Sequence, residues 1–157
     1  MASQGDGDHT IATNRRARHD YEILETVEAG LVLRGTEVKS LRGSHVTFKD
    51  AFATIRNNEA WLVGCHINPY SHGTDANHEP ERDRKLLLHR KEISRLTGKV
   101  AERGLTLIPM RLYFKSGRAK LEIGLARGKK LHDKRATLRE RESRREIEKE
   151  TRARQRA

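Results

Sequence analysis

Three histidines, His66, His72 and His78, recur at intervals of six residues and are the first candidates for chemistry in this chain. A zinc site needs about four converging nitrogen or sulfur ligands. The chain has a single cysteine, Cys65, and two of the histidines fall in a segment without any secondary-structure period. We therefore predict solvated loop histidines and no metal. No nucleophile and base stand together either, so we expect no catalytic residues and no cofactor.

Residues 124–130, with the sequence GLARGKK, are the second candidate, because glycine-rich loops followed by lysine can cradle phosphates. This segment has one residue too few between its glycines and lacks the Ser or Thr that should follow the lysine. It also stands between a predicted strand and a polar tail, where a phosphate-binding loop would lead into a buried helix. These departures exclude a nucleotide triphosphatase.

Positive charge is the most informative property of the sequence. The 157 residues include 33 Lys or Arg and 22 Asp or Glu, which gives a net charge of +11. Residues 127–157 hold thirteen of the basic and six of the acidic side chains, so +7 of the charge lies there. A second basic group comprises Arg82, Arg84, Lys85, Arg90 and Lys91. Basic surfaces release counterions from phosphates, so we expect a polyanionic partner.

A membrane surface is the other possible polyanion, but the sequence predicts no segment that enters or crosses a membrane. No stretch approaches the ~20 apolar residues that span a bilayer. Residues 1–16 contain no apolar run of the kind found in a secretory signal. The lone Cys65 excludes an internal disulfide and fits a reducing compartment. We expect a cytoplasmic protein that binds nucleic acid.

The elements that must position these charges follow from the hydrophobic pattern. All seven aromatic residues lie between positions 21 and 114. We therefore place an OB-type body at residues 19–127, a disordered arm at 1–18 and a basic tail at 128–157. The tail has high helix propensity but little apolar surface, so we expect it to be disordered when free and helical on a polyanion.

Alternation of apolar residues predicts the strands. The predicted strands are 21–33 (one strand, or two joined at Gly30), 48–56, 61–67, 105–115 and 118–127. In the third of these, we expect Trp61, Val63, Cys65 and Ile67 to share one face. Asn57-Asn58 and Ser116-Gly117 are the predicted turns, and a change of apolar parity at Pro109 predicts a bulge.

Two helices and one irregular segment complete the predicted elements. The pattern indicates a short helix at 36–42, a loop at 68–81 and a long helix at 82–103. On such a helix, Leu86, Leu87 and Leu88 span about 200° of arc, so at least one of them must be exposed. The whole pattern predicts a mainly β protein with embedded helices. Its fold is a small, partly open barrel of five or six strands of the OB type, which commonly binds oligonucleotides.

Six stretches of the sequence are long and unusual enough to identify a family. They are NRRARHDY at 14–21, EAG at 28–30, GTEVKSLR at 35–42, RKLLLHR at 84–90, GLTL at 104–107 and GKKLHDKR at 128–135. In this order, they resemble the SmpB family, the SsrA-binding proteins that partner transfer-messenger RNA in bacteria. The resemblance spans residues 14–150.

The resemblance implies a binding protein without catalysis. Its barrel would bind the tRNA-like domain of transfer-messenger RNA and stand in for the missing anticodon arm. The RNA, carrying an esterified alanine and delivered by elongation factor Tu with GTP, would enter the A site of a stalled ribosome. Translation would then switch to the reading frame of that RNA, and the tagged product would go to proteolysis. We expect one monomer for each RNA.

The resemblance also implies which residues make these contacts. On the barrel it implies RNA binding by Glu28, Leu87 and His89, to which we add the basic neighbours Lys85 and Arg90. In the tail it implies contacts with the small-subunit decoding centre and the empty mRNA channel. These residues are Lys129, Lys130, His132, Asp133, Lys134 and Arg135, with His132 at a position where the family can stack an aromatic ring on a base.

Two other functions stay open from the residues alone. A general RNA-binding or ribosomal protein with a basic extension would bind many structured RNAs about equally. An RNA-processing enzyme would need a cluster of carboxylates or histidines, which this sequence does not assemble. A strong preference for a tRNA-like elbow would distinguish the favoured function from the first alternative.

Overall fold

The computed structural model describes residues 8–71, 77–129, 144–149 and 151–152 of the chain. The strands are β1 (Asp8–Thr13), β2 (Tyr21–Leu31), β3 (Val46–Thr47), β4 (Phe52–Arg56), β5 (Glu59–Val63), β6 (His66–Ile67), β7 (Arg84–Leu87), β8 (Thr106–Lys115) and β9 (Arg118–Gly128). The helices are α1 (Ala17–Asp20), α2 (Gly35–Arg42) and α3 (Arg90–Arg103). In the tail, residues 144–149 and 151–152 are helical and exposed.

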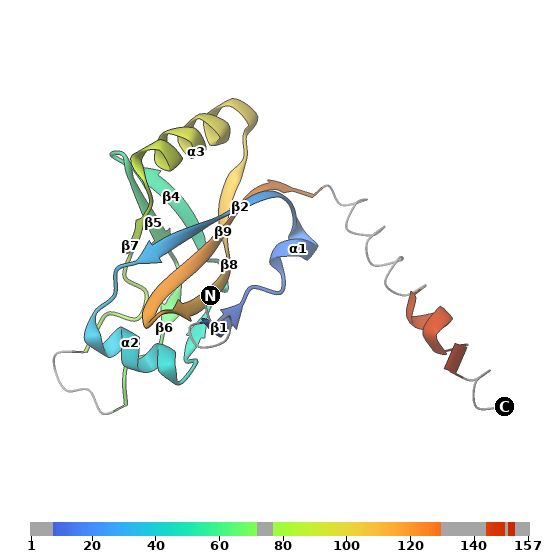
Figure 1. Ribbon diagram of the computed structural model, residues 1–157, viewed down its shortest axis with the longest axis horizontal. Helices are drawn as coiled ribbons and strands as arrows, with labels where there is room; N and C mark the ends of the chain where they lie inside the picture. Colours follow the sequence, from blue (N-terminus) through green and yellow to red (C-terminus); the bar gives the residue numbers. More distant parts are fainter. Residues whose placement is uncertain (1–7, 72–76, 130–143, 150, 153–157) are drawn as a thin grey trace, which may run out of the picture.

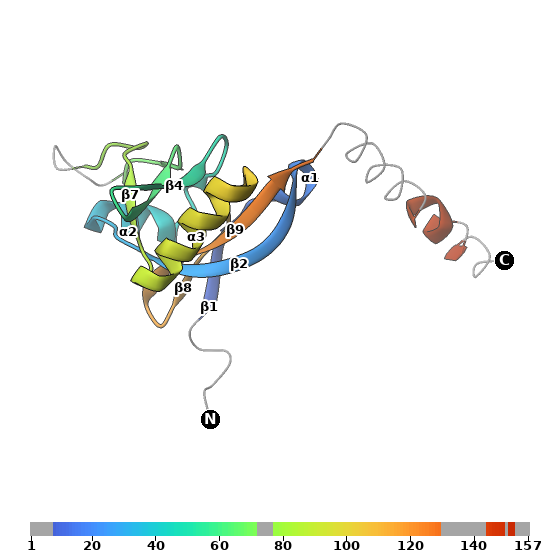
Figure 2. The ribbon, with the colours of Figure 1, turned by 90° about the horizontal axis from the view of Figure 1, so that it is seen from above.

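Antiparallel strands close into a barrel in the order β8-β4-β5-β7-β2-β9, with β9 returning to β8 (Figure 1). Backbone pairing between β4 and β8 is short and, among the described residues, joins Ala53 to Leu107. α3 covers one end of the barrel and α2 lies at the other (Figure 1), and the view from above shows α3 lying across the barrel end (Figure 2). Leu96 of α3 and Leu41 of α2 are fully buried in the same apolar core. The predicted fold class, mainly β with embedded helices, is confirmed.

The long strand and the last hairpin agree with the sequence. In β2 the odd-numbered residues are more buried than the even-numbered ones, so the strand alternates as predicted. Its register shift falls between Ile23 and Glu25, not at Gly30. The β8–β9 ladder shifts register between Pro109 and Arg111, where the bulge is predicted.

The N-terminal segment differs from the prediction, because residues 8–13 are not a free arm. β1 pairs with the second half of β8, and Ile11 is buried in the core. Asn14 then holds the chain against the bulge of β8. Its backbone N–H donates to Met110 O at 2.8 Å, and its side-chain Nδ2 donates to Pro109 O at 2.9 Å. Residues 8–13 therefore pack on the barrel, ahead of the predicted start of the body at residue 19. A strand with one large apolar side chain leaves too little periodicity to be recognised.

The first hairpin lies where the sequence predicts it, but the residues of its second strand that face the core were predicted wrongly. Asn57 and Asn58 both adopt positive φ, of 52° and 62°, which suits a two-residue hairpin turn. In β5, however, Ala60 and Leu62 face the core, and Trp61 is only half-buried. Gly64, at φ 76°, interrupts the strand and restores the predicted parity, so that the next inward residue is Cys65.

The predicted helix at 82–103 is wrong over its first third. Residues 84–87 form β7, between β5 and β2, and the helix begins only at Arg90. The backbone of His89 is still extended, at φ −66° and ψ 148°. Alternation explains the leucines better than a helical arc, because Leu86 is 1% exposed and Leu87 is 54% exposed. Three leucines in a row conceal a period of two.

Candidate nucleic-acid interface

Leu87 is exposed on the outer face formed by β7, β2 and β9, on the β7 side of that face. It pairs with Gly30 of β2, whose other neighbour is Lys120 of β9. Gly30 leaves room for the leucine, since a Cβ placed there would lie 3.2 Å from the Leu87 Cβ. The absence of a side chain at Gly30 therefore lets Leu87 lean across β2. A large apolar side chain is thus offered to a partner between charged neighbours.

Glu28 lies two residues before Gly30 on the same outward face of β2. Its carboxylate accepts a hydrogen bond from the Tyr113 hydroxyl and lies 3.5 Å from Lys115 Nζ. The hydrogen bond from Tyr113 is the main reason that the pKa of Glu28 is lowered. Glu28 is therefore a charged hydrogen-bond acceptor set among basic side chains.

Tyr113 is a member of this face that the sequence reasoning missed. It is 3% exposed, and its ring lies beneath the Arg111 guanidinium, whose carbon is 4.0 Å from the ring centroid. Arg111 also donates to Thr10 Oγ1 at 3.0 Å, which joins β1 to this surface. Burial raises the pKa of Tyr113, and the bond to Glu28 raises it further. The signal in the sequence is one aromatic residue at the outward parity of a strand.

Lys85 and Arg90 border a hollow beside Leu87. The hollow has a volume of about 600 Å³ and lies between β5, β7 and the start of α3. Lys85 is the outward residue next to Trp61 and forms an ion pair with Glu59 at 3.2 Å. The structure therefore brings Lys85, Leu87 and Arg90 together.

His89 and Arg90 take their positions from α3. Glu25 of β2 holds this helix through ion pairs with Arg95 and, at 2.9 Å, with Lys99, and these hydrogen bonds lower the pKa of Glu25. His89 is exposed immediately before the helix, and Arg90 follows in its first turn. Cations oppose the dipole at a helix N-terminus, so a bound phosphate would stabilise this end.

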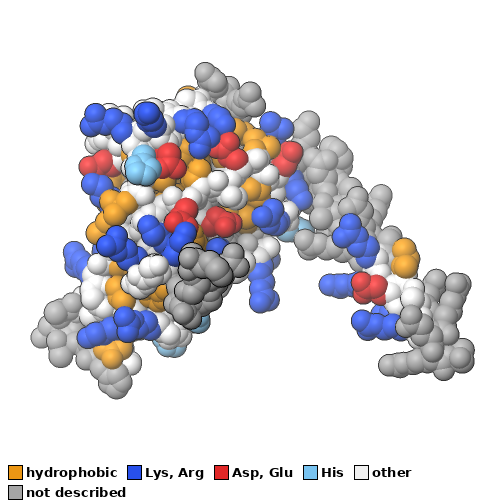
Figure 3. Space-filling model, viewed as in Figure 1, with side chains coloured by type: hydrophobic (Ala, Val, Ile, Leu, Met, Phe, Trp, Pro, Cys, Tyr) orange, Lys and Arg blue, Asp and Glu red, His pale blue; other side chains and the backbone are white. Residues whose placement is uncertain are grey.

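The charge distribution over this face fits a polyanion with a specific footprint. Figure 3 shows Lys and Arg side chains around a smaller group of acidic ones, with apolar side chains exposed toward the β7 side. The acidic group lies over β2 and β9, the strands that carry Glu28 and Glu122. A uniformly basic surface would bind any polyanion, whereas this mixed pattern favours a partner with hydrogen-bond donors as well as phosphates.

The tail leaves the barrel at α1, and Lys129 is bound to the body there. Its amide donates to Asp20 O at 3.0 Å and its Nζ donates to Arg18 O at 2.9 Å. The other predicted tail residues lie outside the described residues. They are Lys130, His132, Asp133, Lys134 and Arg135.

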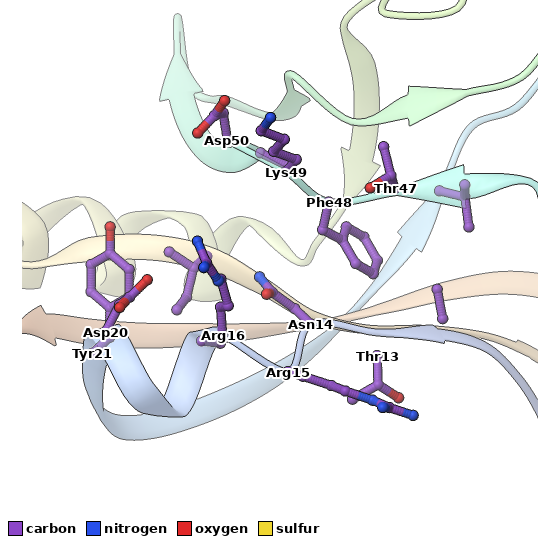
Figure 4. Close-up of a pocket in the computed structure, with 15 residues that line it drawn as sticks. Thr13, Asn14, Arg15, Arg16, Asp20, Tyr21, Thr47, Phe48, Lys49 and Asp50 are labelled. Atoms are coloured by element: carbon purple, nitrogen blue, oxygen red, sulfur yellow. The ribbon is translucent and has the colours of Figure 1, made fainter. Parts of the chain in front are cut away.

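A groove of about 700 Å³ lies beside α1, between the 12–21 segment and residues 46–51. Figure 4 shows Arg16 pointing across it toward the wall that carries Phe48 and Lys49, while Arg15 points away. Asp20 and Asp50 also line the groove, so its charges have both signs. Its lining has three basic side chains against these two acidic ones, and it contains none of the barrel residues that the resemblance implies for RNA binding.

The histidines of the predicted loop have different surroundings. His78 is 3% exposed, which corrects the prediction of a solvated side chain. The polar ring can be buried because both of its nitrogens have hydrogen-bond partners. Nδ1 lies 2.9 Å from Thr36 Oγ1, and Nε2 lies 2.9 Å from Ile67 O. His66 lies 3.4 Å from Glu81, and His72 is outside the described residues. Within the described part of the chain, no group of three His, Cys, Asp or Glu could hold a metal, and no helix is long and apolar enough to cross a membrane.

Comparisons with known proteins agree on one family. Residues 11–153 match the family model described as SmpB protein. An SsrA-binding protein of Desulforudis audaxviator is 60% identical over 138 residues, which cover 88% of this chain and 90% of the relative. The SsrA-binding protein of Thermobifida fusca is 58% identical over 151 residues, covering 96% and 94%. A solved structure described as "tmRNA-SmpB: a journey to the center of the bacterial ribosome" is 56% identical, with a TM-score of 0.65, and covers 76% of this chain and 85% of that one.

Proposed function

The chain belongs to the SmpB family, and we propose that it binds transfer-messenger RNA, the SsrA RNA, and acts with it on stalled ribosomes in trans-translation. The RNA would be gripped by the outer face that carries Glu28, Lys85, Leu87, His89 and Arg90. The RNA element is its tRNA-like domain, for which the barrel replaces an anticodon arm.

The exposure of Leu87 is the observation that carries this proposal. A leucine 54% exposed on a strand contributes nothing to charge-driven binding, but it packs well against a base or a ribose. Specific RNA recognition uses unstacked bases of loops, together with contacts to the 2′-hydroxyl and the phosphates. Leu87 would meet a base or sugar, Glu28 would accept from a base amino group or a 2′-hydroxyl, and Lys85 and Arg90 would meet phosphates.

The tail would supply the contacts with the ribosome. Residues 127–157 carry a net charge of +7 and can enter an RNA-lined channel only when no mRNA fills it. Lys130, His132, Asp133, Lys134 and Arg135 would line the decoding centre and the start of the channel, with Lys129 at the root. Electrostatic attraction would drive entry, and the empty channel would provide the selection.

A competition experiment tests the RNA partner. The whole protein is bound to the labelled tRNA-like domain at fixed salt and challenged with unlabelled tRNA-like domain or with an unrelated hairpin RNA of equal length. Our proposal predicts displacement by the tRNA-like domain at far lower concentration than by the hairpin. Equal displacement would instead support the general RNA-binding alternative, and sequencing the RNA that co-purifies with the tagged protein would provide an independent check.

The remaining partners follow from the same proposal. We propose that one monomer accompanies each RNA and that elongation factor Tu with GTP is present in the delivery complex. The chain would act through binding alone, without catalysis, and at the site of translation in the cytoplasm. Size measurement of the purified complex with RNA, with and without the elongation factor, tests the stoichiometry.

A further inference from the structure

Strand β7 has two possible registers that its own sequence hardly distinguishes. Arg84 and Leu86 face inward, at 0% and 1% exposed. Lys85 and Leu87 face outward. A shift of one residue turns every side chain of a strand to the opposite face. The shifted strand would again place a basic residue inside, followed two positions later by a leucine. Leu86 is buried in the observed register and Leu87 would be buried in the shifted one. Because the two side chains are identical, hydrophobic burial does not favour either register.

The chain segment that precedes β7 does not fix its register either. The β4–β5 and β8–β9 hairpins have two-residue turns, which set the pairing of their strands. β7 instead follows residues 68–83, and the described part of that segment contains no strand or helix. Two residues, Leu88 and His89, separate β7 from α3. The long connection before β7 absorbs a one-residue shift at little entropic cost, whereas after β7 the shift must be taken up by these two residues.

The guanidinium of Arg84 meets acceptors from three separate parts of the chain. Its Nε donates to Glu37 Oε2 of α2 at 2.5 Å. Its Nη1 donates to Cys65 O at 2.6 Å, and its Nη2 donates to Pro80 O at 3.0 Å. Glu37 and Arg84 are both fully buried. A lysine has a single nitrogen on a flexible stem and cannot serve three acceptors in these directions.

We propose that Arg84 selects the register of β7 and so decides that Leu87, and not Leu86, is presented on the outer face. In the shifted register Lys85 would replace Arg84, and buried acceptors would lose their donors, which is costly in a site closed to water. Arg84 is a positioning residue, since it is itself out of reach of RNA. The effect on RNA binding rests on the function proposed above, whereas the register does not.

A cysteine at position 87 reports the register directly. In L87C the new thiol occupies an exposed position, and the native cysteine should not react under the same conditions. The other cysteine, Cys65, is fully buried, and burial raises its pKa to about 11. We expect L87C to react rapidly with a thiol reagent. The exchange variant R84K/K85R/L87C should react at least about tenfold more slowly, because the moved arginine draws position 87 inward.

A second variant covers the case in which the exchange prevents folding. R84K/L87C offers a lysine to the inner site in either register, so its labelling rate should fall between those of the other two. Unfolding would raise the labelling rate, which is opposite to the expected change. Faster labelling in both variants would show that Arg84 merely holds the strand in place and would overturn the proposal, as would an unchanged rate in both.

R82K/L87C is the matched control. Arg82 Nη2 donates to the same carboxylate, Glu37 Oε1, at 2.5 Å, but Arg82 precedes the strand. This control should label at the rate of L87C. Affinity for the tRNA-like domain is then measured for R84K/K85R with Leu87 intact. Slow labelling in the exchange variant with unchanged RNA affinity would uphold the register and refute the RNA contact of Leu87, so the two proposals fail separately.

Discussion

Truncation of Leu87 to alanine is the most direct test of the proposed RNA face. Burying a whole leucine side chain contributes about 1.5–3 kcal/mol. The native side chain is 54% exposed, so about half of this, roughly 1 kcal/mol, remains for a partner to gain. L87A should therefore raise the Kd for the tRNA-like domain about five- to tenfold at constant salt. L87D should raise it further, because its carboxylate would repel phosphates.

The control for this measurement is Leu24→Ala. Leu24 lies on the outward side of β2, is 39% exposed and does not line the hollow beside Leu87. A filter-binding titration gives the Kd of each variant, and thermal melting shows that both remain folded. If L87A binds like the wild type, or if L24A loses as much affinity, the assignment of the RNA face to Leu87 is refuted.

The other predictions concern the tail and two hydrogen-bonded carboxylates. Deleting residues 131–157 should leave the salt dependence of RNA binding nearly unchanged but abolish peptide tagging in a reconstituted translation assay; normal tagging would contradict the role of the tail. Y113F should lower stability to urea by about 1 kcal/mol at pH 7. Since the bond lowers the pKa of Glu28, this loss should fade as the pH falls through the folded-state pKa, and a pH-independent loss would contradict it. E37Q should cost about 3–5 kcal/mol in the same assay, because it leaves Arg84 buried without its anionic partner; a loss below about 1 kcal/mol would exclude that pairing as a major source of stability.

Sequence periodicity was sufficient where strands are long and one face is buried. β2 alternates over eleven residues, and the β8–β9 hairpin has both a turn signal and a parity change at its bulge. It failed at β7, where four residues and three successive leucines allow a helix as easily as a strand. It also failed at β1, whose pairing with β8 depends on contacts about 100 residues away in the chain.

The outer face was only partly predictable for a related reason. The resemblance indicated Glu28, Leu87 and His89, and charge indicated Lys85 and Arg90. The contacts of Tyr113 with Glu28 and of Arg111 with the Tyr113 ring depend on strand register across the barrel. Pairing of β2 with β9, and of β9 with β8, brings these side chains together. The alternation of residues within one strand does not reveal which strands pair or in which register.

The attachment of Lys129 to α1 has a mechanical consequence. Its two hydrogen bonds, to Asp20 O and Arg18 O, set the direction in which the chain leaves β9. Asn14 in turn fastens this corner to β8 through Pro109 O. If one partner held the barrel, covalent linkage would give the tail an effective concentration on the order of millimolar toward surfaces within its reach. Weak contacts of the tail with the ribosome would then add to those of the barrel with RNA and give strong bivalent binding. K129A, which removes the Nζ bond to Arg18 O, should weaken that binding without deleting any contact beyond residue 129.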